Sequence, residues 1–372
     1  MILTLWFCGP TLNATTPGYL LRRHRQEGFR AKVVVESSDV HSLREEHLAP
    51  FYNFRRTPQK QSEHIKIMQL EESRLYAEAD GVWSISDTDK WNMLSLTTKY
   101  GYKGGSVNQS KFSVLRYIGS PWDRYKNHRE SNEGNADNLM YKPFSERSGI
   151  VFVGPGNVPT NVAAIDWFLK AIWPSITEAL PDLKFSIIGA WKTGKGKNVA
   201  EVYTAVIREA MTCKRYNVDF SGKCKIYRNI QWTGRLSQKD LEKSLELSRI
   251  FVSPIQFSTG VNTKNLLALE RSLPLITSVN GSSGLCPHDA CRTWKDGIPY
   301  LVADNQSHFS DLVIDLYRNE ELWANLAIAG KTYSTSALSI AGGALDADRS
   351  LQSMGLFGSL DLRGRTQELN VL

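Results

Sequence analysis

Short apolar runs alternate with longer amphipathic stretches along most of this 372-residue chain. The short runs end at Gly, Pro or polar residues, which is typical of buried strands. We predict strands at 3–8, 32–36, 81–86, 114–118, 150–153, 184–188, 229–233, 250–252, 273–276 and 299–302.

The stretches between these runs carry apolar residues three or four positions apart, which predicts helices with one face on a sheet. Asn161 and Ser237 are predicted helix caps, because such side chains accept the unpaired N–H groups of a first turn. Strands that alternate with helices predict parallel, doubly wound sheets. The predicted fold class is therefore α/β.

A polar stretch at 119–147 has little apolar periodicity and is a candidate linker. It closes a first domain at 1–147, and the alternation of strands and helices restarts in a second domain at 148–335. Residues 336–372 are rich in Ala, Gly and Ser and give no pattern, so we treat them as a tail.

The stretch 251–278 carries the clearest candidate chemistry. A strand is followed by the small-residue turn Ser258-Thr259-Gly260 and then by a helix. Backbone N–H groups point out unpaired at such a helix start, and the helix dipole adds partial positive charge. Lys264 could place an ammonium beside the same anion, although it could also be a solvated helix residue. Our hypothesis is a diphosphate site.

The composition is that of a globular protein, with 41% hydrophobic and 22% charged residues. No window approaches the roughly 18 apolar residues of a membrane span. The first ten residues lack a basic start and favour a strand over a signal peptide, so we expect a cytoplasmic protein. The net charge of +7 suits an anionic small substrate. Without zinc spacing or an RNA-binding pattern, we expect no nucleic-acid partner, and a basic nucleic-acid binder is only a third hypothesis.

The chain has five cysteines, and this odd number favours a reducing compartment or the absence of a disulfide framework. Cys286 and Cys291 flank His288, but a structural metal site needs a second pair of ligands. We predict a loop with incidental cysteines and no metal site.

Several segments in order resemble glycosyltransferase family 4. The C-terminal half contains GIVFVGPGNVPTNVAAIDWFLKAIWPSITEALPDLKFSIIGA and, further on, IQWTGRLSQKDLEKSLELSRIFVSPIQFSTGVNTKNLLALERSLPLITS. The N-terminal half contains VVVESSDVHSLREEH and EESRLYAEADGVWSIS, which are similar to an Asp-x-His-x-x-Arg strand end and an E…L…AD segment of that family.

The resemblance implies the GT-B architecture, in which two Rossmann-like domains face each other across a cleft. The C-terminal domain would hold a nucleoside diphosphate sugar, UDP- or GDP-linked, and the N-terminal domain an unknown glycan, lipid or small-molecule acceptor. Family members transfer the sugar with retention of configuration (EC 2.4), without a cofactor and generally without a metal. No transmembrane segment is expected, and peripheral contact with a membrane surface stays open.

The resemblance also implies roles for individual residues. The implied diphosphate and donor residues are Ser258, Thr259, Gly260, Val261, Lys264, Gly234, Arg235, Gly154 and Gly156. Asp39 and His41 would lie near the acceptor and, with Lys264, serve catalysis. Each has a simpler alternative: Asp39 and His41 can cap the following helix, Arg235 can face solvent, and Gly154 can be an ordinary turn.

The chain departs from the family pattern at two glutamates, whose places are taken by Thr259 and Leu267. A leucine cannot accept hydrogen bonds from a ribose, so we predict Glu270 as its substitute. The N-terminal domain is also predicted to be incomplete. The first hypothesis is a retaining glycosyltransferase, and the alternative is a catalytically degenerate GT-B-fold binding or scaffold protein.

Overall fold

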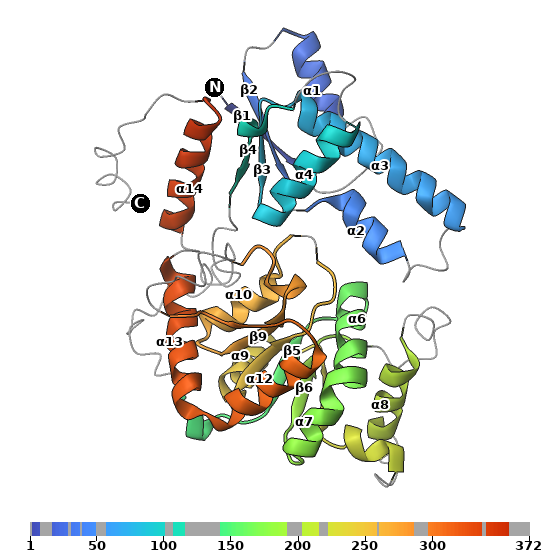
Figure 1. Cartoon of the computed structure of the whole chain (residues 1–372), viewed down its shortest axis with the longest axis vertical. Coiled ribbons are helices and arrows are strands. Elements are labelled where there is room, and N and C mark those ends of the chain that lie inside the picture. Colours follow the sequence, from blue (N-terminus) through green and yellow to red (C-terminus); the bar gives the residue numbers. More distant parts are fainter. Residues whose placement is uncertain are drawn as a thin grey trace. The chain divides into compact units, whose positions relative to one another are not determined.

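The computed structural model describes residues 2–7, 17–28, 31–37, 39–49, 57–100, 107–115, 142–191, 203–215, 222–258, 260–285, 297–336 and 340–356. Contacts between residues divide the chain into two compact units (Figure 1). The first unit comprises 1–43, 58–117 and 340–372, and the second comprises 44–57 and 118–339. The predicted linker at 119–147 and the Cys286–Cys291 loop lie mostly or wholly outside the described residues.

The first unit is built on a parallel sheet with the strand order β1-β2-β3-β4. Its elements are β1 (Ile2–Phe7), α1 (Pro17–Gln26), β2 (Lys32–Ser37), the start of α2 (His41–Leu48), α3 (Pro58–Glu78), β3 (Gly81–Ser84), α4 (Asp87–Tyr100), β4 (Phe112–Val114) and α14 (Ile340–Ser353). Each new strand is added on the same side of the previous one, so the described sheet contains no reversal of strand order.

Alternating valines of β2 explain the core of this unit. Val33 and Val35 point to one face of the sheet and pack with Val82, Leu75 and Met93. The predicted strand at 114–118 was misplaced, because β4 begins two residues earlier at Phe112 and residues 116–118 lie outside the described part.

Helix α14 was not predicted, since its segment is poor in large apolar residues. It joins the first unit late in the chain: Trp83 Nε1 donates a hydrogen bond to Ser350 Oγ at 2.5 Å. Gly81 leaves room for the chain just after α14, because a Cβ there would lie 2.5 Å from Met354 Sδ.

The second unit carries a six-stranded parallel sheet with the order β10-β9-β8-β5-β6-β7. Its elements are β5 (Ile150–Val153), α6 (Pro159–Trp167), the π-helical segment Phe168–Ile172, α7 (Trp173–Ala179), β6 (Phe185–Ile188), α8 (Ala205–Arg215), β7 (Ile230–Gly234), α9 (Gln238–Leu247), β8 (Ile250–Ser253), α10 (Thr263–Glu270), β9 (Leu275–Ser278), β10 (Leu301–Ala303), α12 (Gln306–Arg318) and α13 (Glu320–Ser336). Short 3₁₀ turns lie at Phe144–Glu146, Gly222–Tyr227 and Asn280–Ser282.

The strand order reverses beside β5. The chain builds β5, β6 and β7 in one direction and then places β8 on the other side of β5. This is the doubly wound order, and ligands of such sheets bind at the carboxyl ends of the strands where the order reverses. The β5–β8 pair is therefore the expected binding edge. The predicted α/β class with parallel sheets is confirmed, and the doubly wound order is seen in the second unit.

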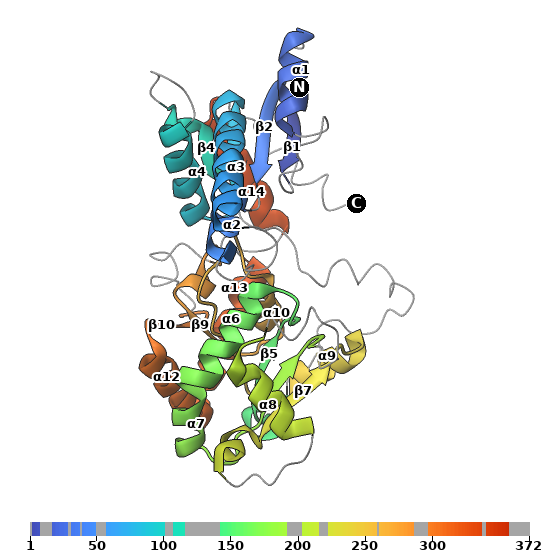
Figure 2. The ribbon, with the colours of Figure 1, turned by 90° about the vertical axis from the view of Figure 1, so that its right-hand side faces the viewer.

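Helices cover both faces of the second sheet. On one face α6, α7, α8 and α12 bury a large core (Figure 2). The connections through α9 and α10 run in the opposite direction along the sheet, so right-handed crossovers place these two helices on the other face. Helix α10 packs against α13, which also contributes Trp323 to the large core. Phe168 and Trp173 of the long helix are fully buried in this core. Its π-helical turn precedes Pro174, which lacks the N–H that a regular helix needs.

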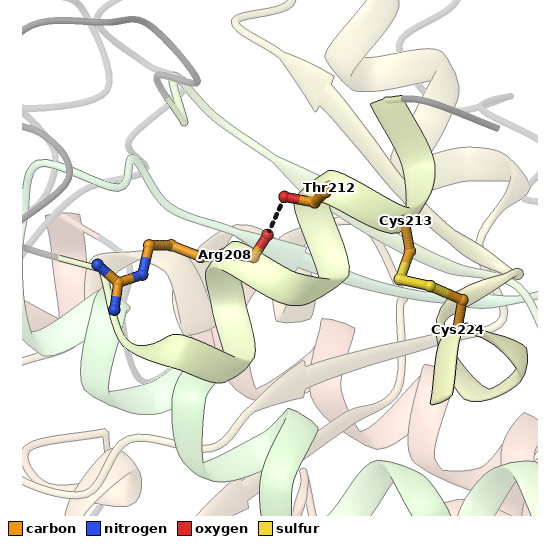
Figure 3. The surroundings of a disulfide bond; sticks show 4 residues. All are labelled: Arg208, Thr212, Cys213 and Cys224. Atoms are coloured by element: carbon orange, nitrogen blue, oxygen red, sulfur yellow. Dashed lines mark hydrogen bonds between the residues drawn. A yellow bond between two sulfur atoms is a disulfide. The ribbon is translucent and has the colours of Figure 1, made fainter. Parts of the chain in front are cut away.

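The odd cysteine count favoured a reducing compartment or the absence of a disulfide framework, but the structure contains a disulfide. Cys213 at the end of α8 is bonded to Cys224 in the following 3₁₀ turn, with 5.6 Å between their Cα atoms (Figure 3). An odd cysteine count leaves one thiol over but excludes no pair. No helix in the described ranges is long and apolar enough to cross a bilayer.

Candidate functional site

The helices that begin at the binding edge of the second sheet fall into two groups. Asn305 and Ser237 cap α12 and α9, which follow the edge strands β10 and β7. The helices α6 and α10 follow the central strands β5 and β8 and have no side-chain cap. Unpaired N–H groups and the positive ends of two dipoles therefore gather at the reversal of strand order, which favours an anion there.

Lys264 is the second residue of α10 and lies at this point. Its Nζ donates a hydrogen bond to Asn161 Oδ1 at 2.5 Å and lies 5.1 Å from the centre of the Phe152 ring. Burial lowers the pKa of the Lys264 ammonium from 10.5 to about 8. Among the described residues, no carboxylate lies within ion-pair distance of Lys264 Nζ.

A lysine in the first turn of a helix is electrostatically unfavourable, because its charge has the same sign as that end of the dipole. Here the lysine is also partly desolvated, and its polar partner among the residues that the structure describes is a neutral amide. The arrangement can bind an anion strongly, since the anion would satisfy the ammonium and the helix start together.

The loop between β8 and α10 is held by amide side chains. Asn262 Nδ2 donates to Ser258 Oγ at 3.0 Å, and Asn265 Nδ2 donates to Gly281 O at 2.8 Å, after β9. Gly260 is buried with a φ of 77°, in the left-handed region that favours glycine. Val261 is half-buried beside it. Thr259 lies outside the described residues.

The prediction that Asn161 caps a helix was wrong. Helix α6 begins at Pro159, and Val158 occupies the cap position. Asn161 is therefore inside the first turn and 3% exposed, where its Nδ2 donates to Pro155 O at 3.0 Å while its Oδ1 receives Lys264. The proline shifts the helix start, because it is pre-organised for the first helical position.

The loop after β5 packs against the protein's own side chains. A Cβ at Gly154 would lie 2.7 Å from Asn161 Cγ, and a Cβ at Gly156 would collide with the Tyr203 hydroxyl. Both glycines thus permit close internal packing, and their predicted contact with a substrate stays a prediction.

Two other predicted donor residues lie apart from Lys264. Gly234 ends the edge strand β7 and the exposed Arg235 follows it, three strand spacings or about 14 Å from β8. Glu270 is the last residue of α10, about 9 Å along the helix axis from Lys264. Leu267 between them is 8% exposed.

In the first unit, Asp39 and His41 are buried where β2 leads into α2, at 8% and 3% exposure. The first two N–H groups of α2 donate hydrogen bonds to a carboxylate of α3. Glu72 Oε1 accepts from His41 N at 2.8 Å, and Glu72 Oε2 accepts from Ser42 N at 3.1 Å and from Ser42 Oγ. Glu72 thus provides the cap that we had considered for Asp39.

Glu72 is buried, with 1% of the residue exposed. Burial raises its pKa from 4.5 to about 7, and Asp39 adds to the increase, whereas the hydrogen bonds from Ser42 and His41 lower it. Sequence reasoning missed this residue, although it lies in the EESRLYAEAD segment that carries part of the family resemblance.

Comparison with known proteins places this geometry in a known fold. Residues 147–319 match the family described as Glycosyl transferases group 1. Sucrose-phosphate synthase from Thermosynechococcus elongatus is similar over 91% of this chain and 71% of its own, with a TM-score of 0.55 and 11% identity. The chain has the GT-B fold.

Two further GT-B structures are similar. The UDP-forming α,α-trehalose-phosphate synthase from Burkholderia xenovorans is similar over 95% of this chain and 73% of its own, with a TM-score of 0.56 and 12% identity. HepE from Anabaena, determined in complex with UDP, is similar over 94% of this chain and 78% of its own, with a TM-score of 0.55 and 9% identity.

A curated relative matches only in part. An uncharacterized 44.6 kDa protein in the cps region of Klebsiella pneumoniae is 21% identical over 170 residues, which are 46% of this chain and 37% of the relative. The GT-B fold thus confirms the predicted fold class, and the activity of the whole protein is a matter of proposal.

Proposed function

We propose that the chain is a glycosyltransferase that binds the diphosphate of a nucleotide sugar at the start of α10. The observation that carries this proposal is Lys264, a partly desolvated ammonium at an uncapped helix start, with no carboxylate partner among the described residues. The match of 147–319 to Glycosyl transferases group 1 supports it.

The chemistry of transfer suits this arrangement. When the bond between the sugar and the diphosphate breaks, negative charge grows on the leaving diphosphate. Preorganised N–H groups and an ammonium stabilise that charge with little rearrangement. We assign the diphosphate to Ser258, Thr259, Gly260, Val261 and Lys264, with retention of configuration and no metal ion or other cofactor as further parts of the proposal.

UDP is the first nucleotide to test and GDP the second. HepE was determined with UDP, and the Burkholderia xenovorans synthase is described as UDP-forming. We assign the acceptor, a glycan, lipid or small molecule, to the first unit, where Glu72 holds the backbone of His41 beside Asp39.

A second candidate function is a GT-B-fold binding or scaffold protein without catalysis. Two observations favour it. Leu267 is buried where a ribose-binding glutamate was expected, and the described first sheet runs β1-β2-β3-β4 without the reversal of strand order at which doubly wound sheets bind ligands.

The test is hydrolysis of, and transfer from, a panel of UDP and GDP sugars by wild type and by Lys264→Ala. We expect turnover in wild type and a loss on the order of 100-fold in the variant, as for removal of one group that stabilises transition-state charge. Lys239→Ala is the matched control, because Lys239 is the second residue of the capped helix α9. Equal turnover in all three proteins would overturn the diphosphate assignment, and nucleotide binding without turnover would favour the scaffold function.

A further inference from the structure

Asn161 connects the start of α6, in which it lies, with the start of α10. Its carboxamide oxygen receives Lys264 Nζ from α10, and its carboxamide nitrogen donates to Pro155 O in the loop after β5. The side chain is buried, and the missing Cβ of Gly154 provides the space in which the carboxamide lies.

The carboxamide orients the ammonium without neutralising it. An aspartate of the same shape would also accept the hydrogen bond, but it would form an internal ion pair with Lys264 and compete with any bound anion. The Phe152 ring of β5 also faces the ammonium, and this ring attracts a cation but carries no net charge.

We infer that Asn161 is the positioning residue of the anion site. Its hydrogen bond holds Lys264 Nζ of α10 beside the start of α6, and because the carboxamide is neutral, the positive charge of Lys264 stays available to a bound anion. This inference rests on the proposed function, because it names the residue on which the diphosphate site depends. It also implies that the loop at 154–156, α6 and α10 act as one unit in binding, since a single side chain joins them.

Two substitutions separate this role from simple packing. Asn161→Ala removes the carboxamide, and Asn161→Asp keeps its shape but adds a carboxylate beside Lys264. A packing role predicts that the isosteric Asn161→Asp variant is the milder one. The inference predicts the reverse for UDP binding, measured by isothermal titration at pH 7: a loss of about 10-fold for Asn161→Ala and of about 100-fold or more for Asn161→Asp.

The control carries the same substitution in a similar setting. The Nδ2 group of Asn229 also donates a hydrogen bond to a proline carbonyl oxygen, Pro181 O, at 2.7 Å. Asn229 directly precedes β7, so it lies at the amino ends of the strands, whereas the proposed anion site lies at their carboxyl ends. We expect Asn229→Asp to bind UDP as wild type does. If Asn161→Asp binds UDP as well as, or better than, Asn161→Ala, the inference is overturned.

A second measurement works even without nucleotide binding. The pKa of Lys264 can be followed in full-length protein by NMR of ¹³Cε-labelled lysine, with the Lys264→Met spectrum assigning the signal. The inference predicts that Asn161→Asp raises this pKa well above the wild-type value and that Asn161→Ala does not. If wild type binds no UDP, the proposed function fails; if the two variants leave the pKa equal, the inference fails.

Discussion

Replacing Lys264 by Met should make the protein more stable and less able to bind a diphosphate. Burial lowers the pKa of the Lys264 ammonium from 10.5 to about 8, which corresponds to about 3 kcal/mol of destabilisation from the charged form. Because the unfolded chain keeps the proton up to pH 10.5, this cost is fully present below pH 8 and disappears as the pH rises to 10.5.

Met keeps the length of the side chain and its contact with Phe152 but carries no charge. The lost hydrogen bond to Asn161 costs about 1 kcal/mol, so we expect a net gain of about 2 kcal/mol at pH 7. For a domain of this size the gain corresponds to a rise in melting temperature of roughly 4–8 °C.

The assay is thermal unfolding without ligand at pH 7 and at pH 10.5, followed by the fluorescence of the buried Trp173 and Trp191 of the second unit. The gain should be present at pH 7 and absent at pH 10.5. A Lys264→Met protein that is less stable than wild type at pH 7 would show that the ammonium already has a counter-charge in the unliganded protein.

Three further predictions follow from the same geometry. UDP affinity should fall as the pH rises above about 8 and Lys264 loses its proton, and titrations of Lys264→Met at several pH values should show no such fall. Glu72 has a pKa raised to about 7, so its contribution to the free energy of unfolding is present below pH 4.5 and is lost as the pH rises through 7. Glu72→Gln should remove this pH-dependent loss of about 3 kcal/mol, measured by urea unfolding at several pH values. A variant whose stability depends on pH as that of wild type does would contradict the prediction. Gly154→Ala should displace the Asn161 carboxamide and weaken UDP binding by about 10-fold, whereas Gly28→Ala, which places a Cβ in open space but strains a turn of the first unit at a φ of 74°, should leave UDP affinity unchanged.

The sheet of the second unit could be predicted from the sequence because its inner strands β5, β6, β8 and β9 are buried almost throughout and therefore read as apolar runs. The run at 150–153 was predicted with the bounds that β5 has, since Gly149 and Gly154 delimit it. The reversal of strand order leaves no such local signal. Helix α14 was missed because its contact with Trp83 joins residues 267 positions apart.

The part of the site that lies within one continuous segment of the sequence could be predicted. A strand, a glycine turn and a helix start with Lys264 are contiguous, so they point to an anion together. The partners of Lys264 and His41 are not contiguous with them: Asn161 lies 103 positions from Lys264, and Glu72 lies 31 positions from His41. Asn161 was mistaken for a cap because a proline two residues earlier shifts the helix start.

The proposed diphosphate site depends above all on the charge of Lys264 at the start of α10. Isothermal titration of UDP at pH 7 into wild type, Lys264→Met and the control Lys239→Met tests this dependence most directly. We expect binding by wild type and the control, and a loss of about 10-fold to 100-fold for Lys264→Met. Equal affinity of all three proteins for UDP, or no binding of UDP or GDP by wild type, would contradict the assignment.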